Sequence, residues 1–386
     1  MSHLESEKNR RPLSVVISGG GTGGHLFPAI SMAGAFMEKD PRTRILFISS
    51  GNEFEIKNLA MVGFDLEKIT VGGLKGKGWL SQIKNLARIP LGIYQAARIL
   101  KRFGPDLVIG VGGYSSGPVA LAAKLMGIDL ALHEQNILPG ITNRALSIFA
   151  KRVYVSFDET RLKGSGGFLP SIHPKKVMVV GNPIRKQILD YAGDRETSDS
   201  LFHVLILGGS QGAHKINVAI MEALEFFKEK QAFYFTHQTG AADAGEVETA
   251  YERHGAAHCV KPFFNDMERR YSVADLIICR SGAGSVSEIS ATGNVAIFIP
   301  FPFAADDHQT LNARTMEKKG AAEIVFEDDL TGRLIYERIS RYQSNEKKRL
   351  EMAEKSRAMG RPDAAYAIVE DCGQWVRRRG HGKMVS

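Results

Sequence analysis

The chain has 386 residues, of which 44% are hydrophobic and 24% are charged, a composition that excludes an intrinsically disordered protein. This length exceeds what one ordinary hydrophobic core supports and predicts two domains. The formal net charge of +8 indicates an anionic partner, without choosing among phosphate, nucleic acid and an acidic membrane.

The first half of the chain alternates between strands and helices. An apolar run rich in β-branched residues leads into a glycine loop at residues 19–24, then into His25 and a helical stretch from about residue 28 to 39. A second glycine loop occupies residues 110–114. Strands are predicted at residues 13–18, 44–49, 106–111, 130–133 and 152–156. This order of strand, loop, helix and strand predicts a parallel sheet.

The second half repeats this opening after a polar linker at residues 190–200. A glycine loop at residues 208–213 follows an apolar strand and precedes helix-compatible sequence from about residue 216 to 228. Strands are predicted at residues 203–207, 233–236, 276–279 and 296–300. We therefore expect two similar doubly wound α/β domains with a cleft between them, with ligands at the carboxyl ends of their strands.

The first glycine loop indicates a diphosphate site. Gly19, Gly21 and Gly24 fit the G-x-G-x-x-G pattern, in which glycine lets the backbone approach a phosphate at a helix N-terminus. An NAD site would also need an acidic residue at the end of the second strand, where Glu53 comes late, and no P-loop lysine follows. A dinucleotide is therefore not favoured, and the alternative is a tight strand-to-helix turn with no ligand.

Seven motifs occur in order between residue 15 and about residue 325. They are GGTGGH at 20–25, GGY at 112–114, HEQN at 133–136, GNPIR at 181–185, GGSQG at 208–212, CRSGA at 279–283 running to Ser287 and Glu288, and DHQ at 307–309 with Asn312 and Ala313. Together they resemble the MurG family, the N-acetylglucosaminyltransferases that form lipid II in peptidoglycan synthesis.

The resemblance implies a GT-B fold, in which two doubly wound Rossmann-like domains face a cleft. It implies UDP-N-acetylglucosamine as donor and undecaprenyl-diphospho-N-acetylmuramoyl-pentapeptide (lipid I) as acceptor. The products would be lipid II and UDP, formed with inversion and without a metal or cofactor. We expect an acceptor- and membrane-binding domain at residues 1–182 and a UDP-sugar-binding domain at 183–363. A C-terminal helix and basic tail at 364–386 would cross back onto the first domain.

The resemblance also implies roles for individual residues. Asn136 would bind the transferred sugar, Arg185 and Ser210 the nucleotide phosphates, the backbone of Phe264 the uracil, Glu288 the ribose and Gln309 the sugar hydroxyls. The other donor contacts would be Thr22, Gly23, Gly24, Ala283, Gly284, Ser285, Val286 and Ser287. The acceptor diphosphate would lie against Gly20, Gly21, Gly112, Gly113 and Tyr114. The role of His308 stays open.

Inverting transfer needs a base for the acceptor hydroxyl and stabilisation of the departing diphosphate. His25 follows the first glycine loop, and an unperturbed histidine pKa of about 6.5 suits proton abstraction. Glu134 is the alternative catalytic base. Helix N-termini after Gly212 and Gly284, with Arg185 or Arg280, could meet the leaving-group charge. The adjacent Asp306 and Asp307 make a poor metal cage, so no metal is expected.

A basic, partly apolar segment indicates a membrane face. Residues 71–105 contain no acidic residue. Their cations are Lys75, Lys77, Lys84, Arg88, Arg98, Lys101 and Arg102, and apolar residues from Leu74 to Tyr94 lie between them. This pattern favours binding to an anionic leaflet, and the alternative is an amphipathic helix packed on the sheet. No apolar run approaches the roughly 20 residues of a membrane span. The family resemblance implies a peripheral protein on the cytoplasmic face of a bacterial inner membrane.

Three other functions stay open. A different GT-B transferase would use another UDP-sugar or acceptor, and a UDP-N-acetylglucosamine epimerase would consume the donor without an acceptor. A nucleic-acid-binding protein is disfavoured because no recognition motif is present. The cysteines Cys259, Cys279 and Cys372 have the spacing of neither a zinc site nor a disulfide framework. Protein partners in cell-wall synthesis are left open.

Overall fold

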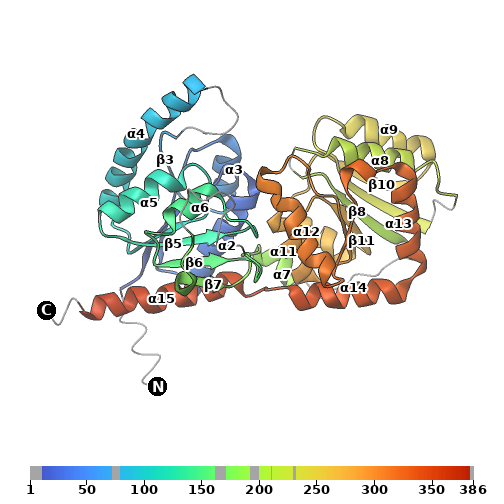
Figure 1. The fold of residues 1–386 in the computed structure, drawn as a ribbon. Helices are drawn as coiled ribbons and strands as arrows, with labels where there is room; N and C mark the ends of the chain where they lie inside the picture. Colours follow the sequence, from blue (N-terminus) through green and yellow to red (C-terminus); the bar gives the residue numbers. More distant parts are fainter. Residues whose placement is uncertain are drawn as a thin grey trace, which may run out of the picture. The chain divides into compact units, whose positions relative to one another are not determined.

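The chain divides into two compact units. The computed structural model describes residues 11–71, 79–160, 171–191, 200–209, 211–228 and 232–382, and of residues 79–87, 305 and 377–382 it describes the backbone alone. Unit 1 comprises Met1–Pro183 and Asp363–Ser386, and unit 2 comprises Ile184–Pro362 (Figure 1). The C-terminal segment at 364–386, expected as a separate part, is thus included in unit 1.

Unit 1 is built on a parallel sheet with strand order β3-β2-β1-β4-β5-β6-β7. Its strands are β1 (Ser14–Ser18), β2 (Arg44–Ser49), β3 (Leu66–Lys68), β4 (Leu107–Gly110), β5 (Asp129–Glu134), β6 (Arg152–Val155) and β7 (Val177–Val179). Its helices are α2 (Gly23–Lys39), α3 (Glu53–Met61), α4 (Trp79–Phe103), α5 (Ser116–Leu125), α6 (Ile141–Leu146) and α15 (Ala364–Gly382), with the 3₁₀ turn η1 (Pro174–Lys176).

Helices cover both faces of this sheet. Val15 of β1 lies in one buried cluster with Phe36 of α2 and Ile368 of α15, whereas Val16 lies in a second cluster with Leu100 of α4. This alternation follows from the two-residue period of a strand, and burial on both sides explains the continuous apolar run of β1. Helix α15 packs against α2, as expected for the C-terminal helix (Figure 1).

Unit 2 has a parallel sheet with the order β10-β9-β8-β11-β12-β13. Its strands are β8 (Phe202–Leu207), β9 (Phe233–Gln238), β10 (Ala257–Lys261), β11 (Leu276–Cys279), β12 (Ala296–Phe298) and β13 (Glu323–Ile324). Its helices are α7 (Lys186–Asp190), α8 (His214–Ala223), α9 (Ala244–His254), α10 (Met267–Val273), α11 (Ala283–Thr292), α12 (His308–Lys318), α13 (Gly332–Ser344) and α14 (Glu346–Met359), with the 3₁₀ turns η3 (Ala305–Asp307) and η4 (Glu327–Asp329).

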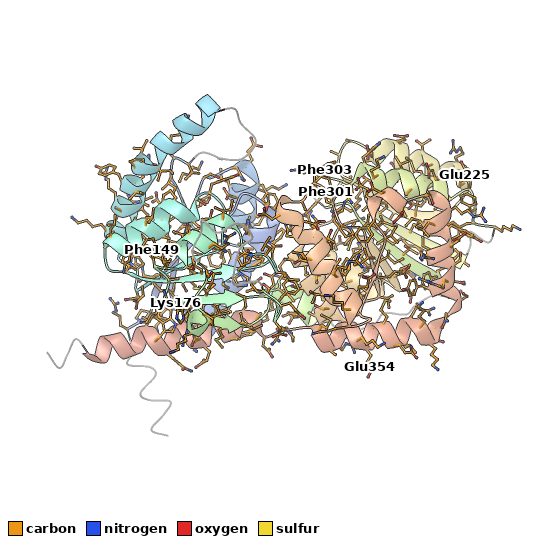
Figure 2. All side chains as sticks on the ribbon, viewed as in Figure 1. Phe149, Lys176, Glu225, Phe301, Phe303 and Glu354 are labelled. Carbon is orange, nitrogen blue, oxygen red and sulfur yellow. The ribbon has the colours of Figure 1, made fainter. Side chains whose placement is uncertain are left out.

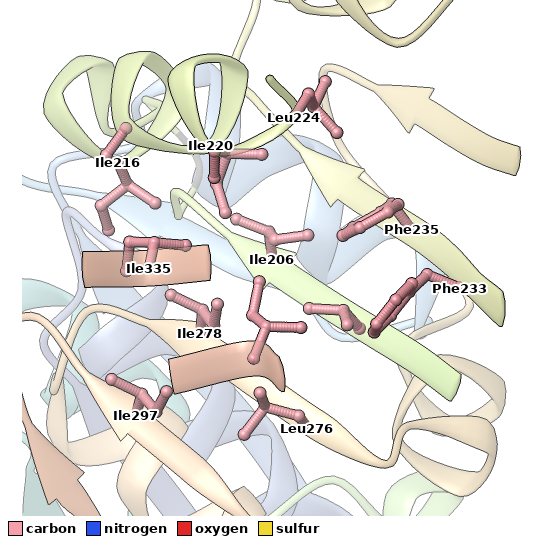
Figure 3. Close-up of a cluster of buried hydrophobic side chains, with 14 of the residues drawn as sticks. Ile206, Ile216, Ile220, Leu224, Phe233, Phe235, Leu276, Ile278, Ile297 and Ile335 are labelled. Atoms are coloured by element: carbon pink, nitrogen blue, oxygen red, sulfur yellow. The ribbon is translucent and has the colours of Figure 1, made fainter. Parts of the chain in front are cut away.

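The core of unit 2 joins helices α8 and α13 to the centre of the sheet. Ile216 and Ile220 of α8 pack in one cluster with Ile206 of β8, Ile278 of β11 and Ile335 of α13 (Figure 3). Each of these side chains is fully or almost fully buried. Burying an aliphatic side chain of this size contributes about 1.5–3 kcal/mol, so this contact fixes the α8 helix on the strand that precedes it.

The two sheets share one topology, which predicts where ligands bind. In each, the first strand of the unit lies centrally and the strand order reverses beside it, between β1 and β4 and between β8 and β11. Loops leaving the carboxyl ends of strands at such a switch point form the binding crevice of doubly wound sheets. The glycine loops after β1, β4 and β8 and the loop after β11 are therefore in the expected positions.

The structure corrects several element boundaries. Helix α2 begins at Gly23 rather than near residue 28, because the turn is completed by three glycines with positive φ, so His25 lies within the first helical turn. Helix α8 runs over His214–Ala223 rather than 216–228. Strands β3, β7, β10 and β13 were not predicted. None of the four contains a fully buried residue, and β3, β7 and β13 have three residues or fewer. Across the described parts of the chain, no helix is both long and apolar enough to span a membrane.

Candidate active site

The first glycine loop of unit 1 requires glycine at residues 19–21. Gly19, Gly20 and Gly21 have φ of 134°, 148° and 93°. A Cβ on Gly19 would lie 2.4 Å from the carbonyl oxygen of Gly112, and one on Gly20 would lie 2.1 Å from Glu55 Oε1. Thr22 then occupies the N-cap of α2 without a side-chain capping bond. The amides of Gly23 and Gly24 stand in the first turn, where a helix attracts anions.

A buried carboxylate that sequence reasoning missed holds this loop. Glu55 Oε1 accepts the N–H of Gly21 at 2.7 Å, and Oε2 accepts the Ser49 hydroxyl at 2.9 Å and the Asn52 N–H at 3.0 Å. Glu55 is 1% exposed. A diphosphate contact through the N–H of Gly21 would require this bond to break. Asn52 and Glu55 form a capping box at the start of α3, and the N-x-x-E spacing was its signal in the sequence.

The second glycine loop lies against the first. Gly112 and Gly113 have φ of 92° and 81°. A Cβ on Gly113 would lie 3.0 Å from the carbonyl oxygen of Gly20, and one on Gly112 would lie 3.0 Å from His25 Cε1. The structure therefore brings the two loops and His25 together at the switch point of unit 1. Tyr114 at the end of the loop is 47% exposed.

His25 heads a chain of polar contacts from α2 into the end of β5. Its Nδ1 lies 3.2 Å from Gln135 Oε1, and Gln135 Nε2 lies 2.9 Å from the carbonyl oxygen of Val111 and 3.2 Å from His133 Nδ1. His133 Nε2 lies 3.2 Å from the carbonyl oxygen of Gly181. Burial lowers the pKa of His133 to about 4, so this imidazole is neutral near pH 7.

Glu134 is tied to the turn between β5 and α6. Its Oε1 accepts the N–H of Asn136 at 3.0 Å, and its Oε2 accepts the N–H of Gly140 at 3.0 Å and the Asn143 side-chain amide at 2.9 Å. Burial raises its pKa, while these hydrogen bonds act in the opposite direction. Both carboxylate oxygens are thus engaged, which favours a role in positioning Asn136 over proton abstraction.

In unit 2 the glycine loop after β8 is closed by backbone contacts. A Cβ on Gly212 would lie 2.3 Å from the carbonyl oxygen of Thr239. Gln238 bridges this loop to the next, because its Nε2 donates to the Gly209 carbonyl at 3.0 Å and its Oε1 accepts the Phe264 N–H at 3.1 Å. A uracil contact through that N–H would replace its hydrogen bond to Gln238 Oε1. Ser210 lies outside the described residues.

Arg185 and Glu288 meet at the α11 helix. Arg185 Nη2 donates to Glu288 Oε1 at 3.1 Å, and the hydroxyl of Tyr271 donates to Glu288 Oε2 at 3.0 Å. Tyr271 was not predicted, and burial, followed by the Glu288 carboxylate, raises its pKa well above the ordinary value, so it remains a donor. Helix α11 begins at Ala283, so the amides of Gly284 and Ser285 lie in its first turn.

Gln309 is anchored at the start of α12. Its Oε1 accepts the N–H of Phe301 at 3.0 Å, and its carbonyl accepts the Ser281 hydroxyl at 2.9 Å. Phe301 and Phe303 form an edge-to-face pair beside it, with Phe303 82% exposed (Figure 2). Within the described residues, no three His, Cys, Asp or Glu side chains cluster as metal ligands would.

Comparison with known proteins identifies the family. The Glycosyltransferase family 28 N-terminal domain matches residues 15–155, and the Glycosyltransferase family 28 C-terminal domain matches residues 203–368. Two proteins named UDP-N-acetylglucosamine--N-acetylmuramyl-(pentapeptide) pyrophosphoryl-undecaprenol N-acetylglucosamine transferase are similar over nearly their whole length. That of Geobacter sulfurreducens is 41% identical over 363 residues, covering 93% of this chain and 98% of its own. That of Syntrophus aciditrophicus is 42% identical over 370 residues, covering 94% and 99%.

The structural comparison agrees. The crystal structure of Acinetobacter baumannii MurG matches with a TM-score of 0.73 at 30% identity, covering 93% of this chain and 98% of that one. The GT-B fold class predicted from the motifs is thereby confirmed. The chain belongs to glycosyltransferase family 28 and, within it, to the MurG family of N-acetylglucosaminyltransferases.

Proposed function

We propose that this protein transfers N-acetylglucosamine from UDP-N-acetylglucosamine to the C4 hydroxyl of N-acetylmuramoyl-pentapeptide on undecaprenyl diphosphate, giving lipid II and UDP. The similarity of 41–42% to transferases of that name, over nearly the whole chain, supports the reaction. The observation that carries the mechanism is His25 in the first turn of α2, between two glycine loops.

His25 acts as the base. Its imidazole takes the proton of the acceptor hydroxyl as that oxygen attacks the anomeric carbon of the donor from the face opposite UDP. The bond to the UDP oxygen breaks in the same step, and the configuration inverts. Gly20, Gly21, Gly112, Gly113 and Tyr114 are proposed to hold the acceptor diphosphate beside the N-terminus of α2, which has no acidic residue in its first turn.

Most of the donor contacts are proposed for unit 2. Thr22, Gly23 and Gly24 of unit 1 are proposed as further donor contacts, with Asn136 on the transferred sugar. Glu288 would accept the ribose hydroxyls, with Arg185 neutralising charge beside it. The free amides at the start of α11 would stabilise the departing diphosphate, since no acidic residue lies in that first turn. The further donor contacts are Ser210, Phe264, Ala283, Gly284, Ser285, Val286, Ser287 and Gln309.

We further propose that the protein works peripherally on the anionic cytoplasmic leaflet. On the described part of α4, Leu91 is 47% exposed and Tyr94 is 60% exposed, while the side chains of Arg88, Arg98 and Lys101 are also exposed. Apolar side chains rimmed by cations suit an anionic lipid surface, which would also hold the lipid acceptor. Lys75 and Lys77 lie outside the described residues, and of Lys84 only the backbone is described.

The deciding experiment measures transfer of labelled N-acetylglucosamine to a lipid I analogue in EDTA. Acceptor-dependent transfer is expected for the wild type, and His25→Ala should lose turnover by about 100-fold or more while still binding UDP. His173→Ala, which removes an exposed histidine of the same unit, is the matched control. Consumption of the donor without acceptor would identify an epimerase or hydrolase instead, and use of another UDP-sugar would identify a different transferase.

A further inference from the structure

A chain of polar contacts leads from His25 into the core of unit 1. Four groups are linked in series: the carbonyl of Gly181, His133, Gln135 and His25, with distances of 3.2 Å at each of the three contacts. None of the proposed substrate contacts involves Gln135 or His133. Substrate binding therefore does not account for the positions of Gln135 and His133.

The direction of each hydrogen bond follows from chemistry at the buried end. A carbonyl oxygen only accepts, so His133 Nε2 must carry the proton that it shares with Gly181. His133 is fully buried and neutral near pH 7, so it carries one ring proton and its Nδ1 is an acceptor. The nitrogen of the Gln135 amide must then face His133.

The same amide orientation is required independently by Val111. Gln135 Nε2 lies 2.9 Å from the carbonyl oxygen of Val111, which also only accepts. The two amide hydrogens are thus directed at Val111 and at His133, and Gln135 Oε1 is left to face His25. Gln135 is 2% exposed, so water does not compete for these contacts.

We infer that Gln135, aligned by His133 and the carbonyls of Val111 and Gly181, is a positioning residue that holds the proton of neutral His25 on Nδ1 and so places the basic lone pair on Nε2. Oε1 can only accept, so the atom facing it, His25 Nδ1, must donate. A histidine bound through one nitrogen in this way acts as a base through the other. This inference rests on the proposed role of His25.

The tautomer of His25 can be measured without substituting Gln135 or His133. In ¹⁵N NMR of histidine-labelled protein at mildly alkaline pH, where an ordinary imidazole is neutral, the His25 signals are assigned by their absence from His25→Ala. We expect the proton on Nδ1. A wild-type enzyme that transfers sugar while carrying the His25 proton on Nε2 overturns the inference. An Nδ1–H signal in a protein without transferase activity would instead overturn the proposed function alone.

A double-mutant cycle separates positioning from general support of the fold. Gln135→Met keeps the side-chain length but removes every hydrogen bond, and we expect kcat to fall by about 10- to 100-fold with little change in KM for the donor. In the His25→Ala background the same substitution should not lower kcat any further. Equal losses in both backgrounds would mean that Gln135 only supports the fold.

Gln95→Met is the matched control for that cycle. Gln95 is a partly buried glutamine of unit 1 whose Oε1 accepts the Thr70 N–H and whose Nε2 donates to the Thr70 hydroxyl, so it loses comparable bonds away from His25. It should leave both kcat and the His25 tautomer unchanged. A loss of kcat in Gln95→Met as large as that in Gln135→Met would contradict a specific role for Gln135.

Discussion

Arg185 and Glu288 form an ion pair, with Arg185 Nη2 3.1 Å from Glu288 Oε1, although the family resemblance assigns them to different parts of the donor. Both side chains are largely buried, at 21% and 14% exposure, so solvent screens the pair only partly. The hydroxyl of Tyr271 holds the second carboxylate oxygen. Arg185, which is proposed to bind the phosphates, therefore orients Glu288, which is proposed to bind the ribose.

This contact predicts that the two residues act together on the donor. Arg185→Ala and Glu288→Ala should each weaken UDP binding by about 10-fold or more, because each leaves a partly buried charge without its partner. The double variant should lose less than the product of the two effects. Calorimetric titration with UDP measures this coupling, and strictly multiplicative losses would show that the pair is not connected in the bound state.

Tyr271→Phe provides a finer test of the same group. Removing the hydroxyl leaves the ring in place but takes one donor from Glu288 Oε2, and hydrogen bonds to charged groups contribute about 1.5–3 kcal/mol. We expect weaker UDP binding with a kcat near the wild-type value at saturating donor. Tyr336→Phe, whose half-buried ring packs on Phe226 and Phe227, serves as the control. Unchanged UDP affinity in Tyr271→Phe would contradict the role given to this hydroxyl.

Glu55→Gln should disturb the first glycine loop. The carboxylate accepts bonds on both oxygens, including the N–H of Gly21, whereas an amide would present its own hydrogens to one set of donors. We expect a loss of about 1–3 kcal/mol in the free energy of unfolding and a lower kcat/KM for the lipid acceptor. Glu53→Gln, at an exposed position of the same helix, is the control. Denaturant unfolding and acceptor titration measure both effects.

The strands and glycine loops could be predicted because their signals are local. A β-branched apolar run followed by glycines marks β1 and β8 in the sequence, and the helices after them show their own periodicity. The start of α2 was misplaced because two glycines and a histidine carry no helix preference of their own. Short edge strands such as β13 gave no signal, since two half-buried residues cannot show a period.

The residues that support the site could not be predicted in the same way. Gln135 stands within the HEQN motif, yet its function depends on His25 and Val111, which reach it only in the folded sheet. Tyr271 lies in an amphipathic helix, where an aromatic residue is ordinarily part of the core. Glu55 alone had a local signal, the capping box with Asn52, which describes the helix start but not the contact with Gly21.

The buried His237 predicts an acid-sensitive unit 2. Burial lowers its pKa to about 3 from 6.5, while its ring contacts Asn217 and Tyr251. The unfolded chain takes up a proton on His237 below pH 6.5 and the folded chain does not. The contribution of neutral His237 to the free energy of unfolding is therefore complete above that pH. It is lost as the pH falls toward about 3, by up to about 1.4 kcal/mol per pH unit.

His237→Gln should therefore flatten the pH dependence of unfolding in that window, although the variant is less stable at neutral pH. The measurement is the free energy of urea unfolding at a series of pH values. His173→Gln, at an exposed histidine, should leave the slope unchanged. A slope for His237→Gln equal to that of the wild type would show that His237 is already protonated in the folded protein.

The exposed residues Leu91 and Tyr94 of α4 are expected to contact the membrane that carries the acceptor. The Arg98 guanidinium lies 5.9 Å from the centre of the Tyr94 ring, and Leu91 is exposed one turn earlier, so an apolar and a cationic group face solvent together. Replacing Leu91 and Tyr94 by glutamate should reduce binding to anionic vesicles by removing apolar burial and adding like charge. Co-sedimentation with vesicles measures the loss, which should be largest at low salt. Leu350→Glu, at a leucine of unit 2 that is 55% exposed, should bind as the wild type does.

The α4 variant should keep its activity on a water-soluble acceptor and lose it on acceptor embedded in vesicles, because only the second substrate requires the surface. Equal activity on both acceptors would contradict the proposed role of this α4 face in membrane binding.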